Sequence, residues 1–232
     1  MSIQSVPHLF DESGGYVGLA PILSESHREC RSRFTPVADL LTWSTRTVRW
    51  QQSGRDEVVE RVDAPADWSD DAVRIVAEKY FAGTPGSLDR ETSVAQMVRR
   101  VSSKVAHEAL TRGYLNSKED ADWFEWDFQY LVYHQIYSPN SPVWFNVGRT
   151  DVPQYVSACY IASIEDDLCT DGLDVSIAGN FVTQAKIFKS GGGFGANYSK
   201  LRSKLERIGG CANFSTGPVS FMEAHDAFGG TI

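Results

Sequence analysis

A cysteine in an apolar stretch is the first residue of this chain whose chemistry could go beyond packing. Cys159 lies in "VSACYIAS", and strand alternation would place four side chains on one face: Ser157, Cys159, Ile161 and Ser163. Such a cysteine is either a small buried hydrophobe or a redox thiol that faces a cavity. A redox thiol needs a partner whose Cα comes within about 7 Å. The sequence leaves three candidate partners open, namely Cys30, Cys169 and Cys211.

A glycine cluster follows in "KSGGGFGANYSKLRS", where Gly191 to Gly195 include four glycines. The cluster matches neither the dinucleotide fingerprint GxGxxG nor the phosphate loop GxxxxGK[ST]. A dinucleotide site also needs a strand before the glycines and a helix after them, whereas this sequence predicts the reverse order. Glycines let a ligand approach bare backbone whose N–H groups are free to donate. The alternative is a flexible turn between a helix and a strand.

Charged residues flank the glycine cluster on both sides. Five carboxylates occur in "IEDDLCTDGLD", residues 164–174, just before a predicted helix. Acids at this position favour a helix N-terminus electrostatically, which explains most of them. One acid beside the basic stretch "KLRSKLER", residues 200–207, could also hold a ribose hydroxyl and a phosphate.

The composition and charge of the chain argue against several classes of function. The net charge of -8 argues against broad binding to nucleic acid or to an acidic membrane, because such binding needs a clustered basic face. The sequence has no apolar run near the roughly 18 residues of a membrane span and no signal-peptide pattern at its start, so we expect a cytoplasmic protein. The four cysteines and five histidines show no metal-ligand spacing. We therefore expect reduced thiols and no metal site in this chain.

The order of elements predicts three regions. Residues 1–42 are expected to be a loosely ordered lead-in. Residues 43–138 should hold a hairpin (45–51 and 57–64) and three helices (69–83, 93–112 and 118–137). From 139 to 232 the pattern changes to strand, helix, strand, helix (155–167, 172–191, 192–203 and 216–232), which is typical of α/β structure. The stretch "SPNSPVWFNVG", residues 138–148, is expected to be a shaped loop that leads into a short strand.

Four motifs, in this order and spacing, resemble the large class II ribonucleotide reductases, which depend on adenosylcobalamin. They are "SPNSPVWFNVG", "SACYIASIEDD", "IFKSGGGFGANYSKLRS" and "GPVSFMEAHDAFGGTI", and the resemblance covers about residues 43–232. It implies an α/β fold in which the chain forms the N-terminal half of a ten-stranded barrel, preceded by a mainly helical region with a β-hairpin. It also implies reduction of ribonucleotides to deoxyribonucleotides for DNA synthesis by thiyl-radical chemistry.

The resemblance implies roles for four residues at the substrate. Cys159 matches the first member of the redox cysteine pair, which protonates the departing 2′ hydroxyl and ends in a disulfide. Ser141 matches a Ser/Thr that contacts the substrate, and the backbone of Ala158 matches the residue that holds the substrate beside the thiol. Gly193 matches the glycine that lets the ribose approach the main chain.

The resemblance also implies an allosteric site for a deoxyribonucleotide effector. Asp166 matches the acid that contacts the sugar of the effector, and Arg202 matches the basic residue that reaches its phosphates. Helices near 173–188 and 218–229 resemble those that pack across a dimer interface. This sequence departs from the family pattern at four positions near the effector loop: Asp167, Cys169, Cys211 and Asn213.

The family's radical cysteine, second redox cysteine and most cobalamin-binding residues would lie beyond Ile232, so turnover is expected to need the C-terminal part of the reductase. Expected partners are a ribonucleoside di- or triphosphate, a deoxynucleotide effector, a second copy and a thioredoxin-type reductant. A ribonucleoside-diphosphate reductase is the favoured enzyme. Two alternatives stay open: a segment of a class I large subunit, and a non-catalytic nucleotide-binding or dimerisation remnant of the same fold.

Overall fold

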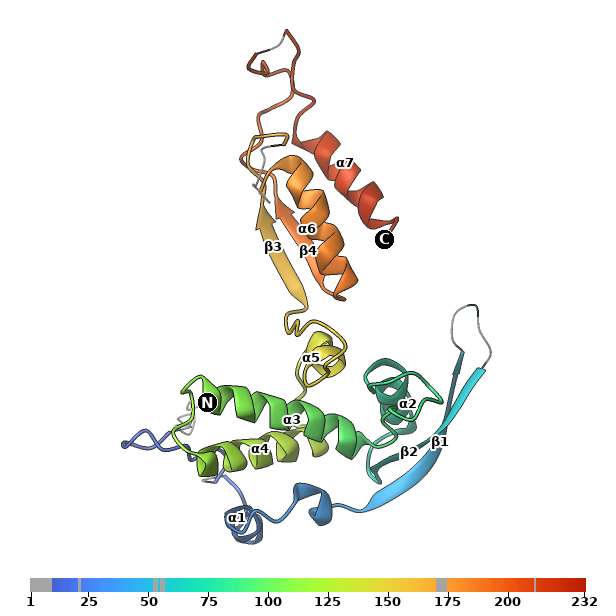
Figure 1. Cartoon of the computed structure of the whole chain (residues 1–232), viewed down its shortest axis with the longest axis vertical. Helices are drawn as coiled ribbons and strands as arrows, with labels where there is room; N and C mark the ends of the chain where they lie inside the picture. Colours follow the sequence, from blue (N-terminus) through green and yellow to red (C-terminus); the bar gives the residue numbers. More distant parts are fainter. Residues whose placement is uncertain (1–9, 21, 52–53, 55–56, 170–174, 211) are drawn as a thin grey trace, which may run out of the picture. The chain divides into compact units, whose positions relative to one another are not determined.

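The computed structural model describes residues 10–20, 22–51, 54, 57–169, 175–210 and 212–232. It divides into two compact units, Met1–Gln154 and Tyr155–Ile232, each with its own core (Figure 1). The mixture of helices and strands agrees with the predicted α/β class, and the described residues form two separate two-stranded sheets. The boundary drawn from the sequence, between residues 138 and 139, lies just before the last helix of the first unit.

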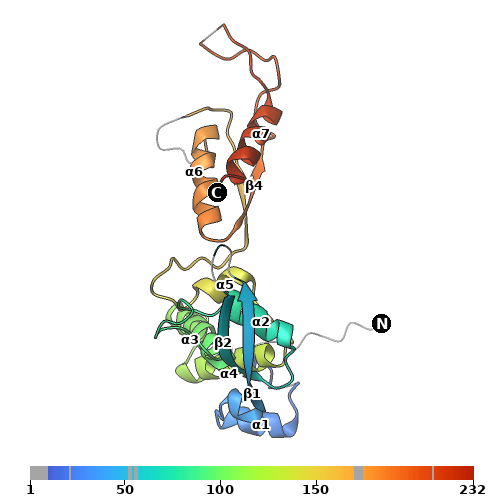
Figure 2. The ribbon, with the colours of Figure 1, turned by 90° about the vertical axis from the view of Figure 1, so that its right-hand side faces the viewer.

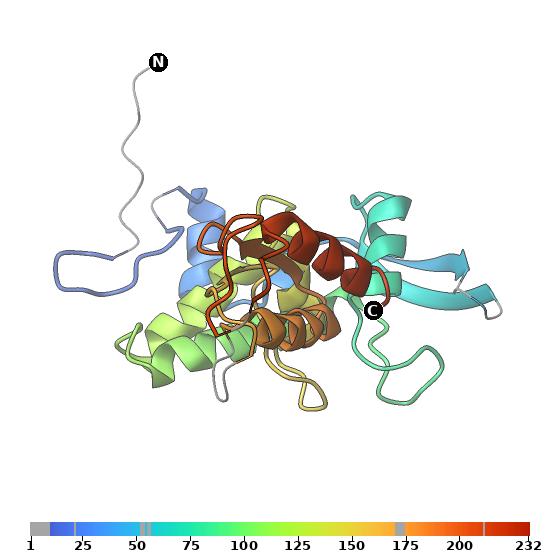
Figure 3. The same cartoon turned by 90° about the horizontal axis from the view of Figure 1, so that it is seen from above.

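The first unit contains the predicted hairpin. Strands β1 (Trp43–Gln51) and β2 (Glu57–Pro65) lie side by side and pair antiparallel (Figure 1, Figure 3). In their register Val48 lies opposite Glu60. Alternate side chains of both strands face the core, since Val48, Trp50, Val62 and Ala64 are buried. The β-branched residues of the two runs therefore account for the hairpin.

The three helices that the sequence predicts are present: α2 (Asp70–Lys79), α3 (Val94–Thr111) and α4 (Lys118–Tyr133). Helices α2 and α3 pack on the hairpin, and α4 packs on α3. Figure 2 shows them gathered beside β1 and β2. Ser69 caps α2, and capping boxes begin α3 at Ser93 and α4 at Ser117. Helix α4 ends four residues before the predicted Tyr137, because Gln135 adopts a left-handed backbone with φ of 55°.

The described part of residues 1–42 is more ordered than the sequence predicts. It includes helix α1 (Glu25–Ser32) and the 3-10 helix η1 (Val37–Leu40). Arg31 of α1 donates from Nε to Asp127 of α4 at 2.7 Å, and both side chains are buried. Asp127 also accepts the Leu19 N–H at 3.0 Å. This buried ion pair ties the segment to α4, which corrects the expectation of a loose lead-in.

The stretch "SPNSPVWFNVG" contains a helix where a loop leading into a strand was expected. Helix α5 (Ser141–Asn146) follows Asn140, whose extended backbone forms the N-cap, and Pro142 occupies the first turn. A helix of 6 residues is too short to show an amphipathic period, so the pattern could not reveal it.

The second unit is a parallel strand pair with two helices. Strands β3 (Cys159–Ser163) and β4 (Gly193–Asn197) are joined through helix α6 (Ile177–Lys189), and helix α7 (Pro218–Gly229) follows. This is the predicted order of strand, helix, strand and helix. Ser176 caps α6, and Gly217, with φ of 83°, precedes Pro218 at the start of α7.

Within the described residues, no helix is long and apolar enough to span a membrane.

Candidate functional site

The strand pair of the second unit has one open face. In the parallel register Cys159 lies opposite Gly193 and Ile161 lies opposite Gly195. Cys159, Ile161 and Ser163 are all exposed, so the predicted alternation is confirmed for these three residues, whereas Ser157 precedes β3 and is half-buried. Ile161 is 88% exposed, which is unusual for a large apolar side chain in a strand. The thiol therefore stands on an accessible surface and is not a buried hydrophobe.

The opposite face of the pair is held by helices α6 and α7. Phe194 of β4 and Phe181 of α6 both stack on His225 of α7, with ring centroids 6.2 and 4.0 Å away. His225 is buried, and its Nδ1 lies 2.9 Å from the Phe221 carbonyl oxygen. Burial also raises the pKa of Tyr198, whose ring meets His225 edge-on. This aromatic cluster fixes the strands from behind and leaves the Cys159 face free.

Gly193 brings bare backbone beside the thiol. Its N–H donates to the Ala158 carbonyl at 2.6 Å. A Cβ at Gly193 would lie 3.5 Å from that carbonyl oxygen and 3.9 Å from the Cys159 sulfur. The absence of a side chain thus leaves a shallow space next to Sγ, and a ligand there would touch both Ala158 and Cys159.

The glycine N–H groups are not free donors, which corrects one part of the sequence interpretation. Gly191 donates to the Phe188 carbonyl at 2.9 Å and Gly192 to the Ile187 carbonyl at 3.1 Å, so both close the end of α6. The glycine cluster therefore supplies a close-approach surface and a helix end, and no cradle of backbone donors.

The described cysteines form no disulfide with one another. Cys159 and Cys169 are exposed in the second unit, and Cys30 is half-buried in the first. The third candidate partner, Cys211, lies outside the described residues. The described residues also contain no group of three or more His, Cys, Asp or Glu side chains that could hold a metal ion.

Asp166 and Arg202 meet in a second location of the same unit. The Arg202 Nε donates to Asp166 Oδ2 at 2.7 Å, and both side chains are about one-third exposed or less. They border a cavity of about 400 Å³ whose remaining wall is mainly apolar, with Leu168, Ile177, Ile208, Phe214 and Phe221. A cavity of this size suits a small molecule with an apolar ring and polar groups.

The loop that carries Asp166 is fixed onto the start of α6. Ile177 donates its N–H to the Asp167 carbonyl at 2.9 Å, and Ala178 donates to Leu168 at 2.9 Å. Glu165 donates its N–H to Val175 at 2.9 Å, and its side chain pairs with Lys200. The stretch is thus held against the start of α6 by backbone hydrogen bonds, whereas the cap of α6 is Ser176 and its first turn contains no acid. Asp166 is the member of the stretch that pairs with Arg202.

Ser141 belongs to the first unit, where it begins α5. Its hydroxyl lies 3.0 Å from the Tyr80 hydroxyl. The structure thus brings Ala158, Cys159 and Gly193 together in one place and Asp166 with Arg202 in another, both within the second unit. Tyr80 is the neighbour that sequence reasoning missed, because it counted only as an apolar position of the predicted helix 69–83.

Comparison with known families gives two matches. The model of the ribonucleotide reductase all-alpha domain matches residues 69–151, and that of the ribonucleotide reductase barrel domain matches residues 157–232. Together the two matches cover well over half of the chain.

The names of individual similar proteins agree with these two family matches. The chain is 40% identical over 197 residues to a vitamin B12-dependent ribonucleotide reductase of Streptomyces coelicolor, covering 84% of this chain and 20% of the relative. It is 32% identical over 229 residues to the protein of that name in Rhodopirellula baltica, covering 85% and 21%. A vitamin B12-dependent ribonucleoside-diphosphate reductase of Mycobacterium tuberculosis is 31% identical over 161 residues, covering 69% and 21%. The chain spans about a fifth of the length of these curated relatives.

Proposed function

The chain belongs to the ribonucleotide reductase family, and from this premise we propose that it forms part of an adenosylcobalamin-dependent reductase that makes deoxyribonucleotides for DNA synthesis. The observation that carries the proposal is the exposed Cys159 thiol beside the bare backbone of Gly193. A ribose that enters this space contacts the thiol directly. The names of the relatives support the cofactor.

In the proposed chemistry Cys159 is one of two reducing thiols. Its proton leaves with the 2′ hydroxyl of the ribose as water. Cys159 and a partner thiol together give two electrons and end as a disulfide, which a thioredoxin-type dithiol then reduces. The partner thiol is expected in the remainder of the reductase. The exposure of Cys159 supports this role, because both the substrate and the partner must reach its sulfur.

Two substrate contacts follow from the surface beside Cys159, and a third follows from the family resemblance alone. We assign the backbone of Ala158 and the bare face of Gly193 to the ribose, because both border the Cys159 sulfur. The Ser141 hydroxyl is assigned to a polar group of the ribonucleotide. The substrate is proposed to be a ribonucleoside diphosphate, with the triphosphate as the alternative; the Mycobacterium tuberculosis relative carries the diphosphate in its name.

The cavity beside Asp166 and Arg202 is the proposed effector site. A carboxylate accepts hydrogen bonds from sugar hydroxyls, and a guanidinium pairs with phosphate oxygens. The apolar wall that includes Phe214 and Phe221 suits a nucleobase. The ligand proposed for this cavity is therefore a deoxyribonucleotide that regulates the reductase.

The architecture of the whole reductase is also a proposal. Residues 139–232 would begin a ten-stranded α/β barrel, with β3 and β4 as two of its parallel strands and residues 43–138 as the preceding hairpin and helical region. The exposed Ile161 supports this, since further strands or substrate would cover the open face. Helices α6 and α7 would pack against a second copy in a homodimer.

Adenosylcobalamin would supply the radical chemistry, and no described residue is assigned to it. As the family resemblance implies, most of its binding groups are expected in the remainder of the reductase. A cytoplasmic location belongs to the proposal as well, because a reducing compartment returns the cysteine pair to thiols after each turnover.

A complementation assay tests the proposal. The chain would be mixed with a polypeptide that corresponds to the rest of the Streptomyces coelicolor relative, adenosylcobalamin, a dithiol and a ribonucleoside diphosphate, and deoxyribonucleotide would be measured. We expect product with the native chain and with Cys169→Ser, and none with Cys159→Ser. Cys169 is the matched control, because among the described residues of the second unit it is the other exposed thiol. Equal activity of the two variants would refute the assignment of Cys159.

A nucleotide-binding module without catalysis is the second candidate, because the Asp166–Arg202 cavity is formed by this chain alone. This second function predicts that the isolated chain binds a deoxyribonucleotide, which calorimetry would measure, and that Asp166→Asn weakens the binding. It also predicts that the complementation assay gives no product. A class I large subunit is distinguished in the same assay, since its activity would not depend on added adenosylcobalamin.

A further inference from the structure

Ser141 has one hydrogen-bond partner that comes from a distant part of the sequence. The Tyr80 hydroxyl, at the end of helix α2, lies 3.0 Å from the Ser141 hydroxyl at the start of α5. A serine hydroxyl rotates among three staggered positions, and a fixed partner selects one of them. The Tyr80 hydroxyl therefore sets the direction in which Ser141 presents its remaining hydrogen-bonding capacity.

Besides its hydroxyl, Tyr80 is held at two points. Its ring stacks on Phe145 of α5, with centroids 6.2 Å apart. Its carbonyl accepts a hydrogen bond from Arg100 Nη2 at 3.2 Å. The same guanidinium donates to the Trp144 carbonyl at 3.0 Å and to the Val147 carbonyl at 2.6 Å. Because Arg100 binds both Tyr80 and α5, it fixes the distance between the tyrosine ring and the helix that carries Ser141.

Arg100 is in turn fixed by a carboxylate. Its Nε donates to Glu91 Oε1 at 2.7 Å, and Glu91 is buried. A guanidinium with a buried carboxylate partner has little freedom to change rotamer. The support behind Tyr80 is thus a charged, hydrogen-bonded junction between α2, α3 and α5.

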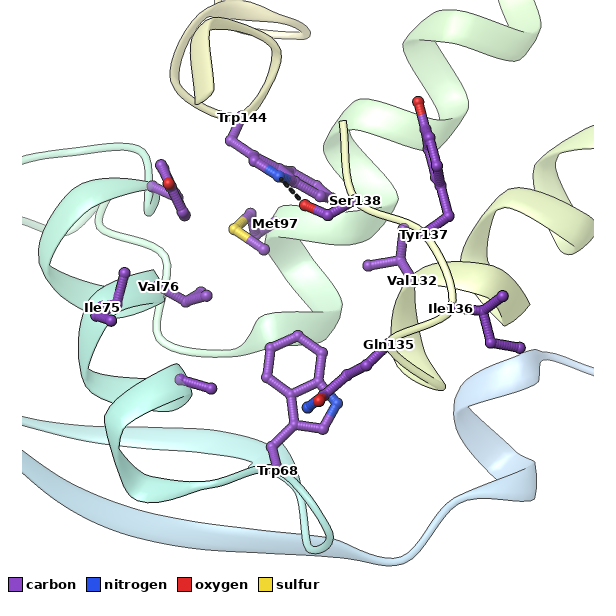
Figure 4. Close-up of a pocket in the computed structure, with 12 residues that line it drawn as sticks. Trp68, Ile75, Val76, Met97, Val132, Gln135, Ile136, Tyr137, Ser138 and Trp144 are labelled. Atoms are coloured by element: carbon purple, nitrogen blue, oxygen red, sulfur yellow. Dashed lines mark hydrogen bonds between the residues drawn. The ribbon is translucent and has the colours of Figure 1, made fainter. Parts of the chain in front are cut away.

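The chain that leads to Ser141 has little packing beneath it. A cavity of about 300 Å³ is bordered by Gln135, Ile136, Tyr137, Ser138 and Trp144 (Figure 4). Tyr80 also contributes to its wall. One bond spans this segment and α5, from Trp144 Nε1 to the Ser138 hydroxyl at 3.1 Å (Figure 4). The Ser141 side chain is itself exposed, so its orientation depends on hydrogen bonds more than on close packing.

We propose that Tyr80 is a positioning residue of the substrate site, which acts through the Ser141 hydroxyl. This inference rests on the proposed contact between Ser141 and the ribonucleotide. Loss of the Tyr80 hydroxyl leaves Ser141 free to rotate, so substrate binding weakens while the reacting atoms beside Cys159 are unchanged. A net hydrogen bond of ordinary strength corresponds to a rise in KM of about three- to tenfold.

The test compares Tyr80→Phe with Tyr137→Phe in the complementation assay. Tyr137 lines the same cavity, and no hydrogen bond links it to Ser141, so it controls for general loss of a hydroxyl. We expect Tyr80→Phe to raise KM about three- to tenfold with kcat nearly unchanged, and Tyr137→Phe to change neither. Ser141→Ala should raise KM, and the double variant Tyr80→Phe/Ser141→Ala should match Ser141→Ala alone.

Each outcome has a separate meaning. A raised KM in Ser141→Ala with an unchanged KM in Tyr80→Phe overturns the positioning role and leaves the proposed function intact. An additive effect in the double variant also overturns it, because Tyr80 would then act independently of Ser141. An unchanged KM in Ser141→Ala refutes the proposed contact between Ser141 and the substrate, and therefore also refutes the positioning role of Tyr80. Absence of product from the native chain refutes the proposed function itself.

Discussion

Replacement of Gly193 by alanine should separate stability from activity. Gly193 lies in β4 opposite Cys159. Its backbone is not left-handed, so an alanine can adopt the same conformation without strain. The new Cβ would meet the Ala158 carbonyl oxygen at 3.5 Å and the Cys159 sulfur at 3.9 Å, which are ordinary van der Waals distances. The folded chain therefore has room for the methyl group.

The two expected effects have opposite signs. A glycine-to-alanine change at a compatible position stabilises a protein by about 0.4–1 kcal/mol, because the unfolded chain loses freedom. The same methyl group fills the space where the ribose would approach the backbone. A displacement of about 1 Å costs on the order of 100-fold in rate. We therefore expect kcat/KM to fall by about 100-fold, which is about 2.7 kcal/mol of transition-state stabilisation.

Hydrogen exchange of the β3 and β4 amides would measure the stability, and the complementation assay would measure kcat/KM. Gly192→Ala is the contrasting control, because its Cβ would lie 2.9 Å from the Tyr160 ring and 3.1 Å from Ile187. That variant should be destabilised by about 1–3 kcal/mol. Faster exchange in Gly193→Ala, or a kcat/KM within threefold of the native value, would refute the close-approach argument.

Three further variants test the fold. Arg31→Met leaves a buried carboxylate of α4 without its partner and should lower the free energy of unfolding by about 3–5 kcal/mol in urea denaturation; a loss below 1 kcal/mol would contradict the role of this pair. Gln135 is a non-glycine residue with a left-handed backbone, so Gln135→Gly should stabilise the chain by about 1 kcal/mol and raise its melting temperature. A lower melting temperature would show that the side chain of Gln135 contributes more than its backbone strain costs. Hydrogen bonds from Lys104 and then Arg112 lower the pKa of Glu108 from its ordinary 4.5 to about 2. A lowered pKa stabilises the fold at pH values above the unfolded pKa. The difference in melting temperature between the native chain and Glu108→Gln should therefore be full at pH 7, shrink as the pH falls below 5 and be lost below pH 2, and an undiminished difference at pH 2 would count against it.

Local sequence patterns predicted the helices and strands that have a clear hydrophobic period and their own cap or turn residues. The hairpin, α2 and α3 each combine a clear period with a cap or turn residue, and α3 begins after Ser93 as its sequence indicates. Helix α5 lacks a full period, and its residues were therefore assigned to a loop. Helix α1 is polar, and its main anchor is the Arg31–Asp127 pair, whose members are 96 residues apart in the sequence. No local window contains that information.

The contacts within the candidate site could not be predicted from local patterns either. Strand alternation correctly placed Cys159 on one face with Ile161, but no pattern sets the parallel register that brings Gly193 opposite the thiol. The pairing of Asp166 with Arg202 also joins two loops through the folded unit, 36 residues apart. Residue patterns pointed to Cys159 and to the glycine cluster, the family resemblance singled out Gly193, Asp166 and Arg202, and the structure supplied their contacts.

The division into two units has a consequence for optical measurements. All six tryptophans of the chain, from Trp43 to Trp144, belong to the first unit. Intrinsic indole fluorescence excited at long ultraviolet wavelengths will therefore report the hairpin and helical region and will be silent for the unit that carries Cys159. This silence is useful, because a single tryptophan introduced as Phe214→Trp in the wall of the Asp166–Arg202 cavity can be read by difference against the native spectrum. Quenching of that added emission by a deoxyribonucleotide would follow occupancy of the cavity in real time, free of any radiolabel or coupled enzyme.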